Sequence, residues 1–595
     1  MDRGEAGKRI EARLPLVIGV TGHRDLRPSE VERLEHMLDV FMRELRADHP
    51  HTPLLLLSPV AEGADRLTAR VALRRGLSLI VPLPMAPEEY ERDFDTEESR
   101  QEFEGLLEQA SYWFSLSDER AQGEARERQY EAVGAYVARH SQILVALWDG
   151  KDLDRIGGTS AIVRSHLSGV SPRAGPLDEV DSGPVYQIVT SRRDGPDVAE
   201  SFQEFTWYPG TGDGTGAARY SGRPTVGHTG RLPFIRQGGR SGASLARLRY
   251  WRIRDRIDRF NQDALRLGMG NRAEIQETKA AILGQRHDDI CGDLERLGEA
   301  FALADALALR FQRRTTRMLM WLFGLASLAA LAIIVYADVI GAAAILWLYP
   351  VFFVLASVVW LIGVKWHDVQ NKYQDYRALA EGLRVQLFWH MAGWTQEAAA
   401  DHYLLRQKSE LDWIRHAMRS LDVPLDVPCD RHGAAALDPE SLRAIRDTWL
   451  RDQLRYFEAR ALRDLSRRRR FRLVAIALTV LGVLAALALA VAAVFLSGSV
   501  DLKPVLLPLA ILLVVAAGLL EGYADKAAFA EQAKQYQRMA RLFDRATRML
   551  DADLKEERLE RAAELLRALG QEALNENADW VMLHRERPLE VIKGA

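Results

Sequence analysis

The first residues that could do chemistry lie where an apolar run meets a glycine-rich turn. Leu14–Val20 has the pattern of a buried strand, and G-x-T-G-H-R ends it, with Gly19, Thr21, Gly22, His23 and Arg24. The next segment, 29–46, has the apolar spacing of a helix. This order favours phosphate binding, because glycine lets the backbone approach an anion and a helix N-terminus offers free N–H groups. An ordinary tight turn between strand and helix is the alternative.

Two further turns of this kind follow apolar runs. The turn after Leu54–Leu57 contains Ser58, Glu62, Gly63 and Asp65, and the turn after Ile143–Trp148 contains Asp149, Gly157, Gly158, Thr159 and Ser160. Because parallel strands end at one edge of a sheet, these turns would meet there and hold one nucleotide. Backbone donors and hydroxyls suit phosphate, and the carboxylates suit ribose hydroxyls or base edges. Capped turns, with Asp and Ser as N-caps, are the alternative.

His23 has two chemical interpretations and one structural interpretation. As a general acid or base it would need an oriented carboxylate partner, which the sequence does not identify. Contact of His23 and Arg24 with a ligand phosphate is favoured, and a purely structural histidine stays open. We therefore expect a binding site without an assigned catalytic residue.

The composition excludes several classes of protein. The 595 residues include 79 Lys and Arg and 82 Asp and Glu, a net charge of −3, so we expect no nucleic acid partner. Cys291 and Cys429 lie far apart and have no metal-ligand neighbours, which favours a reducing compartment without disulfides, metal or cofactor. Residues 1–13 form a polar tail that lacks the apolar core of a signal peptide.

Apolar runs alternate with amphipathic segments over residues 14–200. Buried strands are predicted at 14–20, 54–57, 79–83, 143–148 and 185–190, and helices at 29–46 and 64–75. This alternation predicts an α/β, Rossmann-like head with a parallel sheet. Residues 201–245 are rich in Gly, Ser, Thr and Arg and predict a linker, with a G-x-G phosphate loop at 210–216 as a weaker alternative. Residues 246–312 predict a helical connector.

Four apolar runs are candidates to cross a membrane, which needs about 20 apolar residues. They are Met318–Tyr336, Ile340–Val364, Leu473–Val500 and Pro504–Leu520. Short connections within each pair predict two helical hairpins in an all-α membrane region. The predicted parts are 313–390 and 467–550, each a hairpin with a cytoplasmic helix, a cytoplasmic helical segment at 391–466 and a helical tail at 551–595. The amphipathic tail suits helix–helix assembly, so we expect a homo-oligomer.

Basic residues flank the hairpins on one side. Arg313, Arg314 and Arg317 precede the first run, and Arg467–Arg470 precede the third, whereas the far connections carry few basic residues. The positive-inside rule therefore predicts that both termini and the head are cytoplasmic. A multi-pass protein of the bacterial inner membrane is expected, with the lipid bilayer as a partner.

The head resembles the SLOG superfamily, which includes the DprA and LOG proteins and nucleotide-sensing domains of bacterial conflict systems. The resemblance covers residues 14–192 and rests on V-T-G-H-R, S-P-x-A-x-G-A-D and G-G-T-S. It implies a Rossmann-like head that binds a nucleotide or a nucleotide-derived signal. LOG enzymes carry a catalytic glutamate in P-G-G-x-G-T-x-x-E, but here Ile156 precedes the glycines and Val163 and Arg164 lie where an acid is sought. Hydrolysis by that route is disfavoured.

The two hairpins resemble each other and the SLATT family of two-helix membrane effectors. The segments 376–384 and 536–544 follow the hairpins and share Tyr and Ala at matching offsets, which indicates an internal duplication. The similarity covers residues 300–390 and 446–555 and implies a membrane effector that perturbs the bilayer or forms a pore. Together the resemblances imply a sensor-effector of antiphage defence that binds a small nucleotide signal. A membrane-tethered nucleotide hydrolase and a ligand-regulated channel are the alternatives.

Overall fold

A computed structural model of the chain describes 13–117, 119–151, 157–169, 182–198, 200–209, 218–221, 242–284, 292–337, 342–366, 368–394, 399–403, 411–425, 438–495, 503–526 and 529–585. The G-x-G segment 210–216, both cysteines and most of the polar tail lie outside the described residues. The described chain divides into two units. The first comprises residues 1–304, 379–436 and 573–578, and the second comprises 305–378, 437–572 and 579–595.

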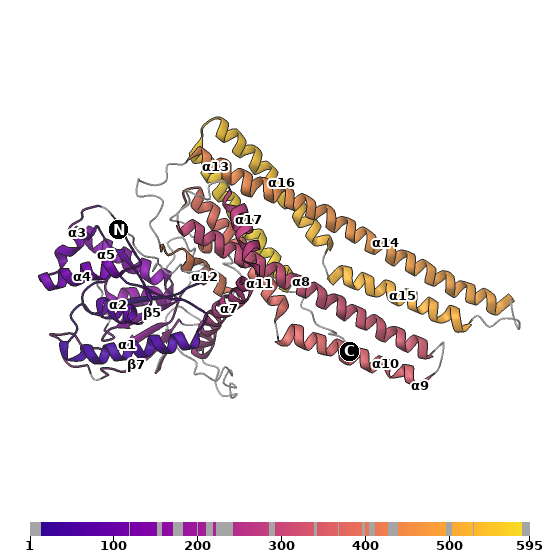
Figure 1. Cartoon of the computed structure of the whole chain (residues 1–595), viewed down its shortest axis with the longest axis horizontal. Helices are drawn as coiled ribbons and strands as arrows, with labels where there is room; N and C mark the ends of the chain where they lie inside the picture. Colours follow the sequence, from indigo (N-terminus) through magenta and orange to yellow (C-terminus); the bar gives the residue numbers. More distant parts are fainter. Residues whose placement is uncertain are drawn as a thin grey trace. The chain divides into compact units, whose positions relative to one another are not determined.

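The head contains an eight-stranded sheet, which confirms the predicted α/β class (Figure 1). Its strands are β1 Leu16–Gly22, β2 Leu54–Leu57, β3 Ser78–Leu83, β4 Tyr112–Ser115, β5 Ile143–Leu147, β6 Val185–Ile188, β7 Glu204–Tyr208 and β8 Ala218–Ser221. Their order is β4-β3-β2-β1-β5-β6-β7-β8, with parallel pairing from β4 to β6 and antiparallel pairing of β7 and β8. The chain adds strands on one side of β1 and then continues with β5 on the other, so β1 and β5 flank a topological switch point.

Helices cover both faces of this sheet. They are α1 Pro28–Asp48, α2 Ala64–Arg74, α3 Pro87–Tyr90, α4 Glu97–Gln109, α5 Glu124–His140 and α6 Thr159–Ser168, with a short 3₁₀ turn at Glu91–Asp93. Helices α1, α2 and α4 share a core with the face that carries Ile18, Leu56 and Val145. Helices α5 and α6 pack on the opposite face, against Val17 and Leu144. Alternate strand residues thus enter two separate cores, as a doubly wound sheet requires.

The sheet extends beyond its predicted limit. Strands β7 and β8 lie within 201–245, so the linker prediction is wrong for these residues and the boundary at residue 200 falls inside the sheet. Strand β4 was also not predicted, because its four residues are only half-buried and its apolar run, Tyr112–Phe114, is short. An edge strand needs little apolar sequence, since it pairs with one neighbour only.

Further helices of the first unit contact the sheet directly. They include α7 Gly242–Leu283 and α12 Asp412–Leu421, and a 3₁₀ turn lies at Ala399–Asp401. The side chain of Asn261 on α7 accepts from the Leu14 amide at 2.9 Å and donates to the Leu14 carbonyl at 2.9 Å. Gln142 accepts from the Val17 amide at 2.6 Å and donates to the His416 carbonyl of α12 at 3.0 Å. The head therefore includes more of the chain than residues 14–200.

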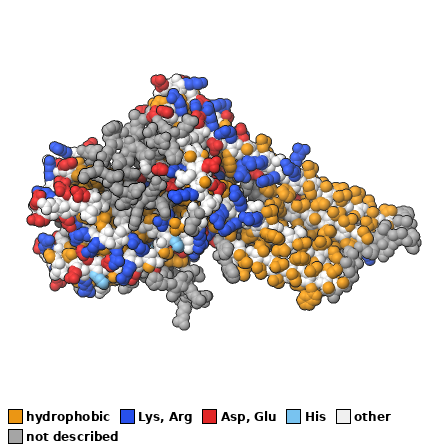
Figure 2. Space-filling view, viewed as in Figure 1, with side chains coloured by type: hydrophobic (Ala, Val, Ile, Leu, Met, Phe, Trp, Pro, Cys, Tyr) orange, Lys and Arg blue, Asp and Glu red, His pale blue; other side chains and the backbone are white. Residues whose placement is uncertain are grey.

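The remaining helices carry the candidate membrane spans (Figure 1). They are α8 Gly292–Val335, α9 Ala343–Leu346, α10 Leu348–Trp360, α11 Val369–Met391, α13 Pro439–Ile445, α14 Arg451–Phe495, α15 Lys503–Lys526, α16 Phe529–Lys555 and α17 Leu559–Arg585, with π-helical turns at Leu361–Trp366 and Arg446–Leu450. Four helical segments among the described residues are long and apolar enough to cross a membrane. Many of their large apolar side chains are exposed, and Figure 2 shows them as one continuous apolar surface. The chain thus has the features of a membrane protein.

The second unit shows how each hairpin packs. Met318 and Leu322 of α8 form a cluster with Ala356, Val359 and Trp360 of α10. In the other hairpin, a Cβ on Gly482 of α14 would lie 3.0 Å from Val514 of α15, so the two helices approach closely there. Below the hairpins the contacts correspond: Phe311 meets Tyr376 at 5.6 Å, and Phe457 meets Tyr536 at 5.9 Å, between ring centroids. These equivalent ring pairs are consistent with an internal duplication.

Candidate functional site

The end of β1 is held between β5 and α2 by its backbone. His23 donates its amide to the Leu147 carbonyl at 3.0 Å, and its carbonyl accepts from the Ala64 amide at 3.0 Å. A Cβ on Gly22 would lie 2.5 Å from both the Ala64 Cβ and the Leu147 oxygen, so only glycine fits. The predicted turn therefore brings β1, β5 and α2 into contact at the carboxyl edge of the sheet.

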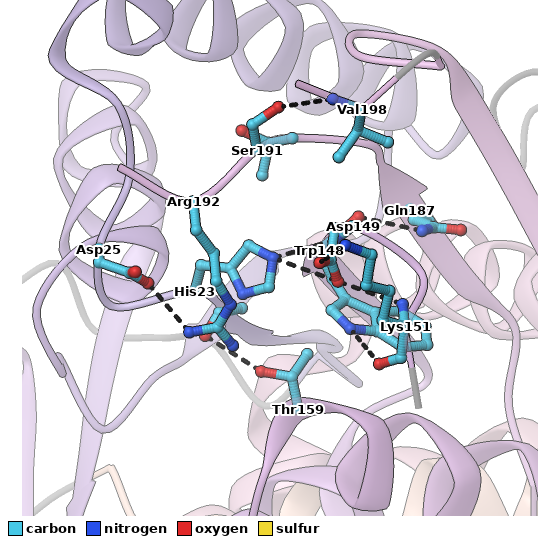
Figure 3. A network of polar contacts seen from close by, with 12 residues as sticks. His23, Asp25, Trp148, Asp149, Lys151, Thr159, Gln187, Ser191, Arg192 and Val198 are labelled. Carbon is cyan, nitrogen blue, oxygen red and sulfur yellow. Dashed lines mark hydrogen bonds and ion pairs between the residues drawn. The ribbon is translucent and has the colours of Figure 1, made fainter. Parts of the chain in front are cut away.

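His23 is a buried, neutral side chain at this edge. Its Nε2 accepts from the Asp149 amide at 3.1 Å and lies 3.4 Å from the Asp149 carboxylate; the shorter contact with the amide places the proton on Nδ1 (Figure 3). Burial, and then the charge of Arg192, lower the pKa of His23 below its usual value, although the neighbouring carboxylates oppose them. The ring is 1% exposed, and Nδ1 has no partner among the described residues. A buried donor of this kind requires an acceptor.

Arg192, which follows β6, adds a positive charge beside His23. Figure 3 shows its guanidinium extending past the imidazole toward Thr159, and it forms a 3.2 Å ion pair with Asp25. Asp149 keeps its own loop in place, since it accepts from the Lys151 amide at 3.1 Å. The edge between β1 and β5 thus combines two donors, His23 and Arg192, with a nearby ammonium group on Lys151, which lies 3.9 Å from Asp149.

The N-terminus of α6 points to the same place. Gly157 has φ +68°, which favours glycine, and Gly158 is the N-cap of α6 without a capping side chain. Thr159 donates its hydroxyl to the Gly22 carbonyl at 3.1 Å and so ties α6 to the end of β1. Ser160 is buried in the first turn. The N-terminus of a helix carries a partial positive charge, so α6 favours an anion at this position.

The other two turns use their helix N-termini for internal contacts. In α1, the buried carboxylate of Glu30 accepts from the Thr190 hydroxyl at 2.7 Å and from the Ser191 amide at 3.3 Å. A carboxylate thus lies in the first turn of α1. The expectation that the helix after β1 offers its N–H groups to a ligand is therefore wrong. At α2, the Ala64 amide donates a hydrogen bond to the His23 carbonyl. Of the three turns that were predicted to bind an anion, the turn before α6 keeps a geometry that suits anion binding.

The residues predicted after β2 lie at the same edge but serve the protein itself. The Ser58 hydroxyl accepts from the Val60 amide at 3.1 Å, and the carboxylate of Glu62 accepts a hydrogen bond from Ser99. Gly63 has φ +77° and is the N-cap of α2. Asp65 is buried in the first turn of α2. These four residues shape the β2 turn against β1.

Asp65 has an unusual acidity that gives a testable pH effect. Burial raises the pKa of Asp65 to about 7, and the charge of Arg24 opposes this only in part. Because the pKa of Asp65 is raised on folding, the folded state binds this proton more tightly than the unfolded state does. The resulting stability is fully present below the pKa of the unfolded state and is lost as pH rises through about 7. We therefore expect the free energy of unfolding of Asp65→Asn to rise relative to that of wild type by on the order of 3 kcal/mol when the pH is raised from 4 to 8. Thermal unfolding of the full chain at both pH values measures this difference. Exposed Asp95→Asn is the matched control, and an equal pH response of the two variants contradicts the assignment.

The other predicted residues of the first turn have contacts within the head. Gly19 is inside β1, where a Cβ would lie 2.2 Å from the Ser141 hydroxyl, so helix packing explains this glycine. Thr21 is buried in β1 opposite Ala146. Arg24 is exposed, with its guanidinium 5.1 Å from the centre of the Tyr130 ring.

Arg192, Lys151 and Glu30 were not predicted. Arg192 follows the strand predicted at 185–190, so the rule that selected the other turns, polar residues after a strand, could have found it. Glu30 had no such signal, because its partners lie 160 residues further along the chain.

No group of three or more His, Cys, Asp or Glu side chains with metal-binding geometry occurs among the described residues. Comparison with models of known protein families gives no match for this chain, and comparison with curated proteins gives none either.

Proposed function

We propose that this chain is a membrane-anchored sensor-effector of bacterial antiphage defence. Its head binds a nucleotide-derived signal through an anionic group at the edge formed by β1, β5 and α6. The four apolar helices respond by perturbing the bilayer or opening a pore, and the chain acts as a homo-oligomer. The resemblances to SLOG sensors and SLATT effectors support this proposal.

One observation carries the binding half of the proposal: two donors lie side by side, and the described residues provide no acceptor that both share. His23 Nδ1 is buried without a described partner, and the Arg192 guanidinium lies beside it (Figure 3). An anionic oxygen would accept from both, and the α6 N-terminus would add its partial positive charge. The location at the switch point between β1 and β5 is the usual ligand position in open α/β sheets. A phosphate or pyrophosphate group satisfies these requirements.

The membrane half of the proposal rests on composition and on the distribution of charge. The apolar segments of α8, α10, α14 and α15 carry exposed leucine, valine and phenylalanine side chains that need lipid contact. Arginines precede the apolar parts of α8 and α14, which favours a cytoplasmic head. A single cysteine at Asp338, in a background without native cysteines, should react with an impermeant maleimide from outside the cell. A single cysteine at Arg468 should not react. Reaction at position 468 without reaction at position 338 would contradict this orientation.

Thermal unfolding of the full chain in detergent, against a panel of nucleotides, cyclic dinucleotides and ADP-ribose derivatives, tests the binding site. The full chain is needed because α7 and α12 contact the sheet and because the sheet extends to β8. A ligand that binds the folded state raises the melting temperature by mass action. We expect Arg192→Gln to raise the Kd of the stabilising ligand about 10- to 100-fold, since hydrogen bonds to charged groups contribute roughly 1.5–3 kcal/mol.

Arg193→Gln is the matched control, because Arg193 is the exposed neighbour of Arg192 in the same loop. An equal loss in both variants, or no shift with any compound, contradicts the proposed site. Conversion of the stabilising compound during incubation would favour the membrane-tethered hydrolase. Ion flux that is present without the ligand and changes when the ligand binds would favour the regulated channel.

A further inference from the structure

A dense group of arginines lies where two of the long helices change from charged to apolar sequence. On α8 the last arginine is Arg317 and the uncharged stretch begins at Met318; on α14 the last is Arg472 and the stretch begins at Leu473. We define the arginine belt as eight of the exposed arginines near these two positions: Arg310, Arg313, Arg317, Arg467, Arg468, Arg469, Arg470 and Arg472. Figure 2 shows Lys and Arg side chains along one end of the apolar surface.

The packing of α14 fixes which sides of the helix carry these charges. Phe471 stacks on Phe529 with ring centroids 5.9 Å apart and lies 5.4 Å from Tyr523. Asp464, seven residues earlier on the same side of the helix, is buried as well. The spacing places Arg468, Arg469, Arg470 and Arg472 on the other sides of the helix, whereas Arg467 lies on the same side as Asp464, three residues after it; all five arginines are exposed. One short stretch of helix therefore presents guanidinium groups on nearly every side that does not pack.

The acidic groups at this level do not balance the arginines. Asp464 lies 3.7 Å from Arg467, and Glu521 and Asp525 lie near Tyr523 at the end of α15. Among the described residues, Arg467 is the one of these eight arginines that forms an ion pair with a carboxylate, so most of the positive charge of the belt is not paired there. Such an excess beside an apolar surface costs free energy through mutual repulsion unless anions neutralise it.

We propose that the arginine belt binds the phosphodiester headgroups of anionic membrane lipids. The position supports this partner, because a headgroup layer lies directly outside the apolar layer that the four spans would occupy. The residue type supports it as well, because guanidinium donates two parallel hydrogen bonds to phosphate oxygens, whereas ammonium acts as a point charge. The belt thus fixes the depth of α8 and α14 and makes the membrane half sensitive to the content of anionic lipid.

Titration of the full chain in dodecyl maltoside with dioleoyl phosphatidylglycerol or dioleoyl phosphatidylcholine, read by thermal unfolding, tests the belt. We expect phosphatidylglycerol to stabilise at lower concentration than phosphatidylcholine, and this preference to shrink between 50 mM and 500 mM salt. Each basic residue near an anionic surface changes binding about fivefold. The triple variant R468Q/R469Q/R470Q should therefore raise the apparent Kd for phosphatidylglycerol at least tenfold, while R468K/R469K/R470K keeps part of the preference.

R538Q/R541Q/R545Q, which removes three exposed arginines from α16, is the matched control and should bind phosphatidylglycerol as wild type does. Equal stabilisation by both lipids in the wild type overturns the proposal without any variant. So does an unchanged Kd in the glutamine variant. Full stabilisation by inorganic phosphate alone would assign the belt to free phosphate, and nuclease-sensitive material lost only in the glutamine variant would assign it to nucleic acid. Either result overturns lipid binding.

Discussion

Replacement of Asp422 by Ala should lower the free energy of unfolding of the first unit by about 3–5 kcal/mol, the usual cost of removing one partner from a buried ion pair. The carboxylate of Asp422 is 9% exposed and lies 3.1 Å from His390 Nε2 and 3.9 Å from His140 Nε2. Gln386 donates to it at 3.0 Å. His140 ends α5 and His390 lies near the end of α11, so one carboxylate joins the sheet layer to a helix distant in sequence.

A fourth element meets at the same point. Arg296 on α8 donates to the carbonyls of Leu421 and Val423, at 2.8 and 2.6 Å, on either side of Asp422. Arg296 is 7% exposed, and this burial lowers the pKa of its guanidinium. Loss of the Asp422 carboxylate would leave these buried donors with less negative charge around them, and each unsatisfied group costs free energy.

The effect of Asp422→Ala should depend on pH in one direction. Burial alone would raise the pKa of Asp422, but the neighbouring imidazoles of His140 and His390 outweigh it and hold the pKa well below its usual range. A lowered carboxyl pKa stabilises the fold above the unfolded value of about 3.9, and the contribution is lost as pH falls below it. The difference between wild type and variant should thus be present at pH 5 and shrink below pH 4.

Thermal and denaturant unfolding of the full chain in detergent measures this difference. Asp422→Asn separates charge from shape, because the amide keeps an acceptor for Gln386 but loses the charge. Glu124→Ala is the control, since it removes an exposed i,i+4 pair with Arg128 that should contribute less than about 0.5 kcal/mol. A cost for Asp422→Ala as small as that for Glu124→Ala would show that the cluster contributes little to stability.

The parts of the fold that the sequence predicted are those with a local signal. Continuous apolar runs located β1, β2, β3, β5 and β6, and longer uncharged runs located the four candidate spans. The rule that ligands bind at the carboxyl ends of parallel strands placed His23, Asp149 and Thr159 at one edge, where the structure brings them together. These predictions needed only the period and length of apolar segments.

The parts that the sequence did not predict depend on contacts between distant residues. Glu30 closes the N-terminus of α1 through Thr190 and Ser191, and Gln142 reaches the carbonyl of His416 across 274 positions. The Asp422 cluster likewise combines α5, α8, α11 and the residues after α12. No local pattern distinguishes such side chains from ordinary polar surface residues, because their roles arise only when the elements pack.

Gly63→Ala should both destabilise the head, by about 3–5 kcal/mol, and abolish the response to ligand. Gly63 has φ +77° and ψ −115°, a conformation that is strained for any residue with a side chain. A Cβ there would lie 2.4 Å from the carbonyl oxygens of both His23 and Arg24. These are backbone atoms, so no side-chain rotation can relieve the overlap and the turn after β1 must move.

This movement should reach the proposed site by a short path. The Ala64 amide, next to Gly63, donates to the His23 carbonyl, and the ring of the same histidine accepts from the Asp149 amide. Displacement of His23 would therefore separate its Nδ1 from Arg192 and from the N-terminus of α6. Thermal unfolding of the variant with and without the stabilising nucleotide measures both effects in one experiment.

Gly76→Ala provides a matched control within the same head. Gly76 follows α2 with φ +67°, but a Cβ there would have no neighbour within 4 Å. Its substitution should cost only the left-handed backbone penalty of about 1–2 kcal/mol and leave the ligand response intact. Both glycines have a positive φ, so the difference in unfolding free energy between the two variants measures the effect of the close approach of α2 to the β1 turn alone. Equal costs at both positions, or a full ligand response in Gly63→Ala, would show that the contact of Gly63 with the β1 turn does not position the site.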